Sequence, residues 1–331
     1  MKVLTAIVLT ALLLVAGCGN DESGPPEASK TRYTIDPQSI SVSGVSAGAY
    51  MAGQFHVAHS SLVRGAGLIA GGPYGCALGS MQTALGACTK EGQPSLGPLL
   101  DAARASAAAG VIDSLDALAG QPAWLFRAPG DAAMGLALTQ AAAEFYRAFD
   151  ALPVEVTSVE TVHGIPTLAA GVACDEFAPP YLNACGYDAA GEILKTLHAT
   201  TAERGSGSGE LRTVSVPGAD DAHLLPEAYL YVPKACAAGE TCGVHVFFHG
   251  CQQSSEELGD TVAREAGFNE WADAHSLLVL YPQVKSSKFA PLNPLGCFDW
   301  WGYTDDGYAT RDGAQIRAVK TLLDQLAGTT L

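Results

Sequence analysis

The chain has 331 residues, of which 48% are hydrophobic and 16% charged, enough apolar side chains to build a sizeable buried core. Its 34 acidic residues outnumber the 18 basic ones, so the formal net charge is −16 at pH 7. The sequence contains no basic cluster, and this composition excludes nucleic acid as a partner.

The first 18 residues are typical of an export signal that is removed and takes no part in the fold. Lys2 precedes an apolar run over residues 3–16, which is too short to cross a bilayer as a mature helix. The run ends in Val-Ala-Gly-Cys at residues 15–18, which resembles a bacterial lipoprotein signal in which Cys18 becomes the lipidated first residue. Ordinary secretory cleavage near Ala16 is the alternative.

Residues 19–32 have no apolar periodicity and predict a flexible tether. We expect residues 33–331 to form a single catalytic domain behind it. The protein is therefore expected to be exported, and either lipid-anchored to the outer membrane or cell surface through Cys18 or secreted.

The most informative motif is Gly-Val-Ser-Ala-Gly at residues 44–48, with Ser46 at its centre. It follows a predicted strand at residues 40–43 and precedes a predicted helix, which is the context of a nucleophile elbow. The helix N-terminus would face an oxyanion formed at Ser46. A Gly/Ser turn between two core elements is the alternative.

From residue 40 onward, short apolar runs alternate with amphipathic stretches. This alternation predicts an α/β fold with a mainly parallel sheet and helices on both faces. Helices are predicted over residues 189–198, with Asp188 as N-cap, over 262–275, and near the C-terminus, where Ile316, Val319, Leu322, Leu323 and Leu326 share one face. Further strands are predicted at residues 66–70, 123–126, 154–157, 228–232, 244–248 and 277–281.

A serine nucleophile needs a base, and a carboxylate that holds the base in the right tautomer. Asp131 follows the strand at residues 123–126, and His163 follows the strand at 154–157. Loops at the carboxyl ends of strands are where doubly wound sheets place their sites, so we predict a Ser46–Asp131–His163 triad. The other seven histidines are expected to be structural or solvated, and are His56, His59, His198, His223, His245, His249 and His275.

A strand followed by His-Gly-Cys, at residues 246–251, has the form of a loop that donates an oxyanion-hole N–H. In an ordinary α/β-hydrolase this loop precedes the nucleophile, but here it follows Ser46 by about 200 residues. A circularly permuted α/β-hydrolase fold reconciles the two positions. The predicted oxyanion donors are the backbone N–H groups of Ala47 and Cys251.

Apart from Cys18, the chain has eight cysteines, and an even number in an exported chain favours disulfides. A zinc site is the alternative, but the chain has no C-x-x-C pair. Six cysteines form three local couples and leave the last two for each other, although other connectivities are possible. The predicted bridges are Cys76–Cys88, Cys174–Cys185, Cys236–Cys242 and Cys251–Cys297.

Six motifs together resemble the single-domain short-chain-length polyhydroxyalkanoate (poly(3-hydroxybutyrate)) depolymerases. They are GVSAGAYM at residues 44–51, AGGPYGC at 70–76, VHGIP at 162–166, HGCQQS at 249–254, LYPQ at 280–283 and GCFDWWG at 296–302. The resemblance implies a circularly permuted α/β-hydrolase with Ser46 as nucleophile, Asp131 and His163 as its partners, and Cys251 as oxyanion donor. It also implies four disulfides.

The activity implied is ester hydrolysis of poly(3-hydroxybutyrate)-type polyesters through an acyl-enzyme, with no metal or cofactor and no obligate protein partner. Trp300, Trp301 and Tyr303 are candidates for the apolar substrate groove, with core packing as their alternative role. Two other functions remain open: a carbohydrate esterase that removes acetyl or feruloyl groups, and a non-catalytic surface lipoprotein.

Overall fold

The computed structural model describes residues 32–90 and 92–331. The predicted export signal at residues 1–18, the predicted lipidation site Cys18, and all of the predicted tether except Arg32 lie outside the described residues. Arg32–Leu331 form one compact unit. Within the described ranges, no helix is long and apolar enough to cross a membrane.

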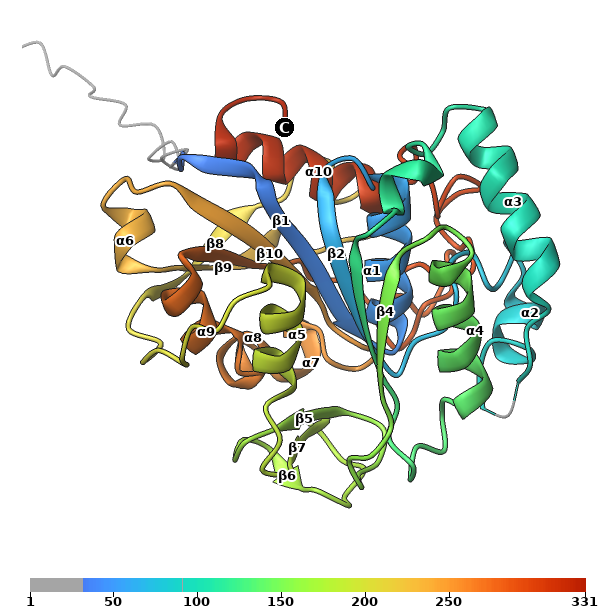
Figure 1. Cartoon of the computed structure of the whole chain (residues 1–331), viewed down its shortest axis with the longest axis horizontal. Helices are drawn as coiled ribbons and strands as arrows, with labels where there is room; N and C mark the ends of the chain where they lie inside the picture. Colours follow the sequence, from blue (N-terminus) through green and yellow to red (C-terminus); the bar gives the residue numbers. More distant parts are fainter. Residues whose placement is uncertain (1–31, 91) are drawn as a thin grey trace, which may run out of the picture. The chain divides into compact units, whose positions relative to one another are not determined.

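The fold is organised around an eight-stranded sheet in the order β4-β3-β2-β1-β10-β11-β9-β8 (Figure 1). Neighbouring strands are parallel except at β9, which is antiparallel to both β11 and β8. Every residue of β10 and β11 is buried, as expected for parallel strands covered on both faces. The strands are β1 (Ile35–Val45), β2 (Val63–Ile69), β3 (Pro122–Phe126), β4 (Leu152–Val156), β8 (Glu210–Ser215), β9 (Glu227–Val232), β10 (Cys242–Phe248) and β11 (Leu277–Tyr281).

The strand order confirms the permuted fold that the sequence predicts. The strands of the large sheet can be renumbered along the chain from β8, so that β1 follows β11. Their order in space, from the β8 edge to the β4 edge, is then 1-2-4-3-5-6-7-8. In that count β10, which leads into the His-Gly-Cys loop, precedes β1, which leads into the serine turn. The two strands are direct neighbours in the sheet, with Val42 opposite Val246 and Gly44 opposite Phe248.

Two hydrophobic clusters lie on opposite faces of the sheet, because adjacent residues of one strand point to opposite sides. In β11, Leu278 and Leu280 belong to the cluster that contains α1 and α10, whereas Leu277 and Val279 belong to the cluster that contains α5 and α9. The helices are α1 (Ala47–Ala58), α2 (Met81–Leu85), α3 (Leu96–Ala108), η1 (Leu115–Leu118), α4 (Leu136–Arg147), α5 (Ala189–His198), α6 (Lys234–Ala237), α7 (Ser255–Leu258), α8 (Thr261–Glu265), α9 (Phe268–His275) and α10 (Ala314–Ala327).

One predicted helix is wrong in its extent. The sequence predicts a continuous helix over residues 262–275, but the structure divides it into α8 and α9. The break falls at Gly267, whose φ of 93° lies in the left-handed region that a continuing helix does not allow. The α5 prediction is confirmed, including Asp188, which accepts a hydrogen bond from the Gly191 N–H as N-cap.

A second, three-stranded sheet was not predicted. It consists of β5 (Ile165–Thr167), β6 (Val172–Ala173) and β7 (Leu182–Ala184), in the order β5-β7-β6. Figure 1 shows it beyond the end of the large sheet, on the side where the parallel strands end. Strands of two or three residues are too short to show an alternating pattern, so the sequence gives no signal for them.

The eight described cysteines form four disulfides with the predicted pairing. The bridges are Cys76–Cys88, Cys174–Cys185, Cys236–Cys242 and Cys251–Cys297. The first three join residues 6 to 12 positions apart, whereas the fourth joins two loops separated by 46 positions. Disulfides of this kind persist in oxidising compartments, which supports an exported protein.

A buried serine–histidine network lies within the large sheet. His245 binds Ser41 Oγ through Nδ1 at 2.8 Å and Ser43 Oγ through Nε2 at 2.7 Å, and Ser41 Oγ also lies 2.9 Å from His198 Nε2. Ser41, Ser43 and His245 have no exposed surface, so no substrate can reach these three side chains. The network is a structural one that satisfies polar groups inside the sheet.

Burial keeps several of the histidines neutral. It lowers the pKa of His56 and of His249 to about 4 each, and that of His198 to about 3. In the unfolded chain these imidazoles titrate near their ordinary value of 6.5. Between pH 6.5 and 4 the unfolded chain therefore binds protons that the folded chain does not, and stability falls as the pH falls through this window.

We predict that the free energy of unfolding decreases between pH 7 and pH 5, by roughly 2 kcal/mol at pH 5 for each imidazole with a folded pKa near 4. Urea denaturation at a series of pH values measures this. The variant His56→Gln, which lacks one of these groups, should lose less stability over the same range. Equal free energies of unfolding at pH 7 and pH 5 would contradict the prediction.

Candidate active site

Ser46 occupies a strained turn between β1 and α1. Its φ of 58° and ψ of −121° lie outside the regions that a non-glycine residue prefers. The turn is fixed by the Ser46 N–H, which donates to the Ile69 carbonyl at 2.8 Å, and by the N–H groups of Ala49 and Tyr50, which donate to the Ser46 carbonyl. This strand–turn–helix geometry is the one that a nucleophile elbow requires.

The two glycines of the motif are required by close packing. A Cβ at Gly44 would collide with the Gly48 carbonyl oxygen, and a Cβ at Gly48 would collide with the carbonyl oxygens of Phe248 and His249. Because Gly44 and Gly48 have no Cβ atom, the serine turn packs directly against the end of β10.

Asp131 and His163 form a hydrogen-bonded pair at the ends of β3 and β4. His163 Nδ1 lies 2.8 Å from Asp131 Oδ2, with the aspartate side chain 1% exposed and the histidine side chain 14% exposed. The other carboxylate oxygen, Oδ1, accepts from the N–H groups of Ala133 and Met134 at 2.8 and 2.9 Å. The carboxylate is therefore held in one orientation, and His163 Nε2 is the ring nitrogen left for a substrate or nucleophile.

The loops that carry these two residues contact each other. The Gly130 N–H donates to the Thr161 carbonyl at 3.1 Å, and a Cβ at Gly130 would lie 2.6 Å from the same oxygen. Residue 130 directly precedes Asp131, and residue 161 lies two positions before His163. Glycine at this position thus permits the approach that pairs the carboxylate with the imidazole.

Two adjoining cavities meet at Ser46. One, of about 290 Å³, is lined mainly by apolar side chains and is called here the apolar arm. The other, of about 170 Å³, contains His163 and is called the histidine arm. Ser46, Ala133 and Cys251 line both. The serine therefore lies where a substrate occupying both arms would have its central bond.

Trp300 and Trp301, two of the three aromatics predicted to bind substrate, line the apolar arm. The Trp300 ring stacks on Tyr50 of α1, with the ring centres 4.6 Å apart. Tyr303 is not among the lining residues. Its hydroxyl donates to the Cys297 carbonyl and accepts from Gln315, and its ring packs against Trp301 at 4.9 Å between centres.

The turn that carries Trp300, Trp301 and Tyr303, called here the aromatic turn, is held by the buried carboxylate of Asp299. This side chain accepts hydrogen bonds from the backbone N–H groups of residues 301, 302, 303 and 304, and from the Thr304 hydroxyl. Burial raises the pKa of Asp299, and these hydrogen bonds act in the opposite direction. Sequence reasoning assigned no role to this residue, which shapes the wall of the apolar arm.

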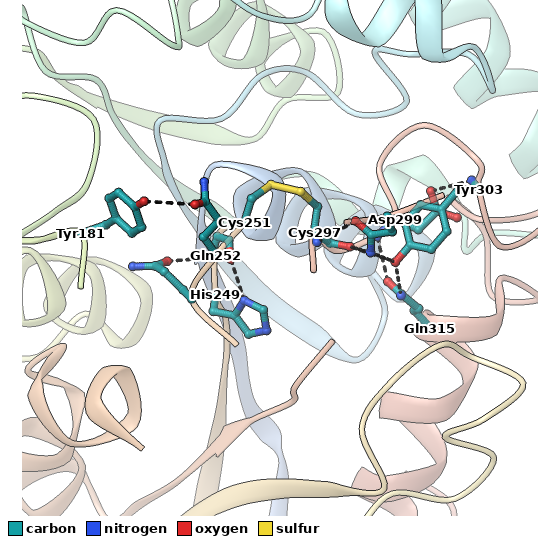
Figure 2. Close-up of a disulfide and its surroundings, with 11 residues drawn as sticks. Tyr181, His249, Cys251, Gln252, Cys297, Asp299, Tyr303 and Gln315 are labelled. Atoms are coloured by element: carbon teal, nitrogen blue, oxygen red, sulfur yellow. Dashed lines mark hydrogen bonds between the residues drawn. A yellow bond between two sulfur atoms is a disulfide. The ribbon is translucent and has the colours of Figure 1, made fainter. Parts of the chain in front are cut away.

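The histidine arm has an aromatic wall that sequence reasoning missed. Phe177 is 60% exposed, and its ring meets His163 edge-on at 6.1 Å and Tyr181 at 5.2 Å. The Tyr181 hydroxyl donates to Gln252 Oε1 at 3.4 Å (Figure 2). Both aromatics lie between Cys174 and Cys185. The signal in the sequence that could have indicated them was this disulfide-closed loop, which follows the predicted base His163.

The two predicted oxyanion donors are free for a ligand. Ala47 and Cys251 both line the apolar arm beside Ser46, and within residues 32–90 and 92–331 their backbone N–H groups have no hydrogen-bond partner. The Cys251–Cys297 disulfide joins the His-Gly-Cys loop to the aromatic turn (Figure 2). A second link is the Gln252 N–H, which donates to the Leu295 carbonyl at 2.7 Å.

Together these groups provide a serine at a strained elbow, an imidazole paired with a buried carboxylate, and two unpartnered amides on one cleft. This is the set of groups that acyl transfer requires.

Comparison with known proteins agrees with this chemistry. No family model matches the chain. The chain is 32% identical over 312 residues to a polyhydroxybutyrate depolymerase of Talaromyces funiculosus, an alignment that covers 89% of this chain and 91% of the relative. The chain belongs to the polyhydroxybutyrate depolymerase family. It is also 33% identical over 309 residues to a poly(3-hydroxybutyrate) depolymerase of Delftia acidovorans, and spans 61% of that protein's length.

Solved structures of the family have the same fold. A polyhydroxybutyrate (PHB) depolymerase from Penicillium funiculosum superposes with a TM-score of 0.83 at 29% identity, covering 90% of this chain and 98% of that chain. The same values hold for a serine-to-alanine variant of a PHB depolymerase in complex with an R3HB trimer.

Proposed function

We propose that the protein is an exported serine esterase that hydrolyses ester bonds of poly(3-hydroxybutyrate)-type polyesters or their oligomers. The observation that carries this proposal is the convergence on one cleft of Ser46, the His163–Asp131 pair and the unpartnered amides of Ala47 and Cys251. Membership of the polyhydroxybutyrate depolymerase family, in which one solved protein is complexed with an R3HB trimer, supports the substrate class.

In the first step Ser46 Oγ attacks the ester carbonyl while His163 Nε2 takes its proton. Asp131 keeps the proton of Nδ1 in place and stabilises the imidazolium that forms. The carbonyl oxygen becomes an oxyanion that accepts hydrogen bonds from the N–H groups of Ala47 and Cys251. Collapse of the intermediate breaks the ester bond, and His163 protonates the leaving alkoxide.

In the second step a water molecule replaces the leaving alcohol. His163 takes a proton from the water as it attacks the acyl-enzyme, and the same two amides hold the second oxyanion. Ser46 recovers its proton from His163 as the acid is released. Each step uses groups of this chain and water.

The two arms support one orientation of the substrate. The leaving alkoxide receives its proton from His163, which lines the histidine arm but not the apolar arm. The alcohol part of the ester therefore lies in the histidine arm and the acyl part in the apolar arm. Trp300, Trp301 and the neighbouring apolar side chains suit the methyl-bearing backbone of a hydroxybutyrate chain.

The decisive experiment compares substrates. The purified domain should release 3-hydroxybutyrate or its short oligomers from poly(3-hydroxybutyrate) and from its trimer, and should act far more slowly on acetylated or feruloylated xylan. Product chromatography measures both. Faster turnover of the xylan esters would favour the carbohydrate-esterase alternative instead.

The triad roles are tested with the same substrates. Ser46→Ala and Asp131→Asn should each lower kcat by about a thousandfold or more, the second because an amide next to Nδ1 favours the wrong imidazole tautomer. Thermal unfolding measured in parallel should show that both variants fold. Ordinary turnover by a folded Ser46→Ala variant would remove this serine from the mechanism.

The orientation predicts a role for Phe177. We expect Phe177→Ala to raise KM by roughly two- to tenfold for the hydroxybutyrate trimer, whose alcohol part reaches the aromatic wall, and to leave KM for ethyl 3-hydroxybutyrate unchanged. Leu168→Ala is the matched control, because Leu168 is also exposed on a nearby loop but lines neither arm. Equal effects of the Phe177 variant on both esters would argue against this orientation.

The export signal and anchor remain part of the proposal. The Val-Ala-Gly-Cys sequence at residues 15–18 supports lipidation of Cys18, followed by a tether and the catalytic domain over residues 33–331. Expressed in a bacterium with radiolabelled palmitate, the full chain should incorporate label and partition with membranes, and Cys18→Ser should do neither. Unlabelled protein in the medium would indicate secretion without an anchor.

A further inference from the structure

We infer that His249 is a positioning residue: it fixes the peptide that carries the Cys251 N–H, and so sets the direction of one oxyanion donor. The inference rests on the proposed function, since the donor matters only if an oxyanion forms at Ser46. His249 lies directly after β10, is 2% exposed, and lines neither arm of the cleft, so it does not touch the substrate.

Both ring nitrogens of His249 are engaged with backbone groups. The Val284 N–H donates to Nε2 at 3.2 Å, and Nδ1 lies 2.7 Å from the Gly250 carbonyl oxygen. A backbone amide can only donate, so Nε2 carries no proton and accepts. The proton is therefore on Nδ1, which donates to the Gly250 carbonyl. Burial lowers the pKa of His249 to about 4, which keeps this neutral tautomer at neutral pH.

Because of peptide geometry, this hydrogen bond to the Gly250 carbonyl also sets the direction of the Cys251 N–H in the active site. The Gly250 carbonyl and the Cys251 N–H belong to one planar trans peptide, so they point in opposite directions. When His249 holds the carbonyl on the buried side, the N–H faces the opposite side, where Cys251 lines the apolar arm. Figure 2 shows His249 on the Cys251 side of the disulfide, next to the loop whose peptide it holds.

The remaining groups of the loop are fixed by other partners. The Gly250 N–H donates to Gln253 Oε1 at 2.7 Å, and Gln253 Nε2 donates to the Pro180 carbonyl at 3.0 Å. The Cys251 side chain is tied to Cys297. The Gln252 N–H donates to the Leu295 carbonyl. His249 therefore holds the Gly250–Cys251 peptide, a different peptide group from those that the glutamine, Leu295 and the disulfide hold.

Two substitutions separate the contacts of His249. His249→Asn retains an N–H donor near the Nδ1 position, whereas His249→Gln retains an acceptor near the Nε2 position and loses the donor to Gly250. His56→Gln is the matched control, because His56 on α1 is equally buried, has both nitrogens engaged by Tyr146 and Gln121, and lies outside the cleft.

The substrates are 4-nitrophenyl 3-hydroxybutyrate and the analogue in which sulfur replaces the carbonyl oxygen. Sulfur is a weak acceptor, so the ratio of the two turnover rates reports how well the amides bind the oxyanion. We expect His249→Gln to lower kcat for the ester by roughly ten- to a hundredfold with KM unchanged, and to lower the ester-to-thionoester ratio. The His249→Asn variant should retain a higher kcat for the ester and a higher ester-to-thionoester ratio than His249→Gln. The His56→Gln variant should have the same kcat and the same ratio as the unmodified protein.

Several results would overturn the inference. One is an ester-to-thionoester ratio that is the same in His249→Gln, His56→Gln and the unmodified protein; another is a ratio lower in the asparagine variant than in the glutamine variant. If His249→Gln does not fold, the asparagine variant decides, and a collapse of its ratio overturns the inference. Absence of any ester hydrolysis by the unmodified protein would overturn the proposed function as well, so the two failures are distinguishable.

Discussion

The site depends on the close approach of two backbone segments that lie about 200 residues apart. β1 and β10 are neighbours in the sheet, and the turn after β1 packs on the end of β10 at Gly48, where any side chain would meet the carbonyl oxygens of Phe248 and His249. This contact brings the Ala47 N–H at the start of α1 and the Cys251 N–H beyond β10 onto one cavity. The two-donor oxyanion hole that we propose depends on that approach.

Around this contact, the polar groups that shape the cleft wall have partners of their own. Asp131 uses one oxygen for two amides and the other for His163, and Asp299 binds the amides of the aromatic turn. The loop amides of Gly250 and Gln252 are likewise engaged. Groups fixed in this way do not reorganise when charge develops, which is the condition under which hydrogen-bond donors stabilise a transition state most strongly.

The parts of the site that the sequence predicts are those with a local signal. The glycines around Ser46 mark a strained turn, and the strand before His249 marks the donor loop, so the permuted sheet follows from their order. Asp131 and His163 were placed by their positions after strands. The aromatic wall at Phe177 and Tyr181 has only the indirect signal of a disulfide-closed loop after His163, because a tertiary contact with Gln252 and His163 brings it to the cleft.

The same limit applies to the aromatic turn and to one helix. Trp300, Trp301 and Tyr303 are close in sequence, but their directions depend on the hydrogen bonds to Asp299, and only the two tryptophans face the cavity. The helix predicted over residues 262–275 has the right periodicity, and the positive φ of Gly267 interrupts it. Periodicity describes which side chains are buried and not whether the backbone between them is continuous.

The histidines show how burial divides one residue type among different roles. His245 is enclosed with Ser41 and Ser43 on one face of the sheet, where the three side chains resemble a nucleophile and its base but have no exposed surface. His249 is also buried, and both of its nitrogens are used by backbone groups. His163 combines a carboxylate partner on one nitrogen with an exposed edge on the cleft. A base must both be oriented and be reachable, and of these three imidazoles His163 alone meets both conditions.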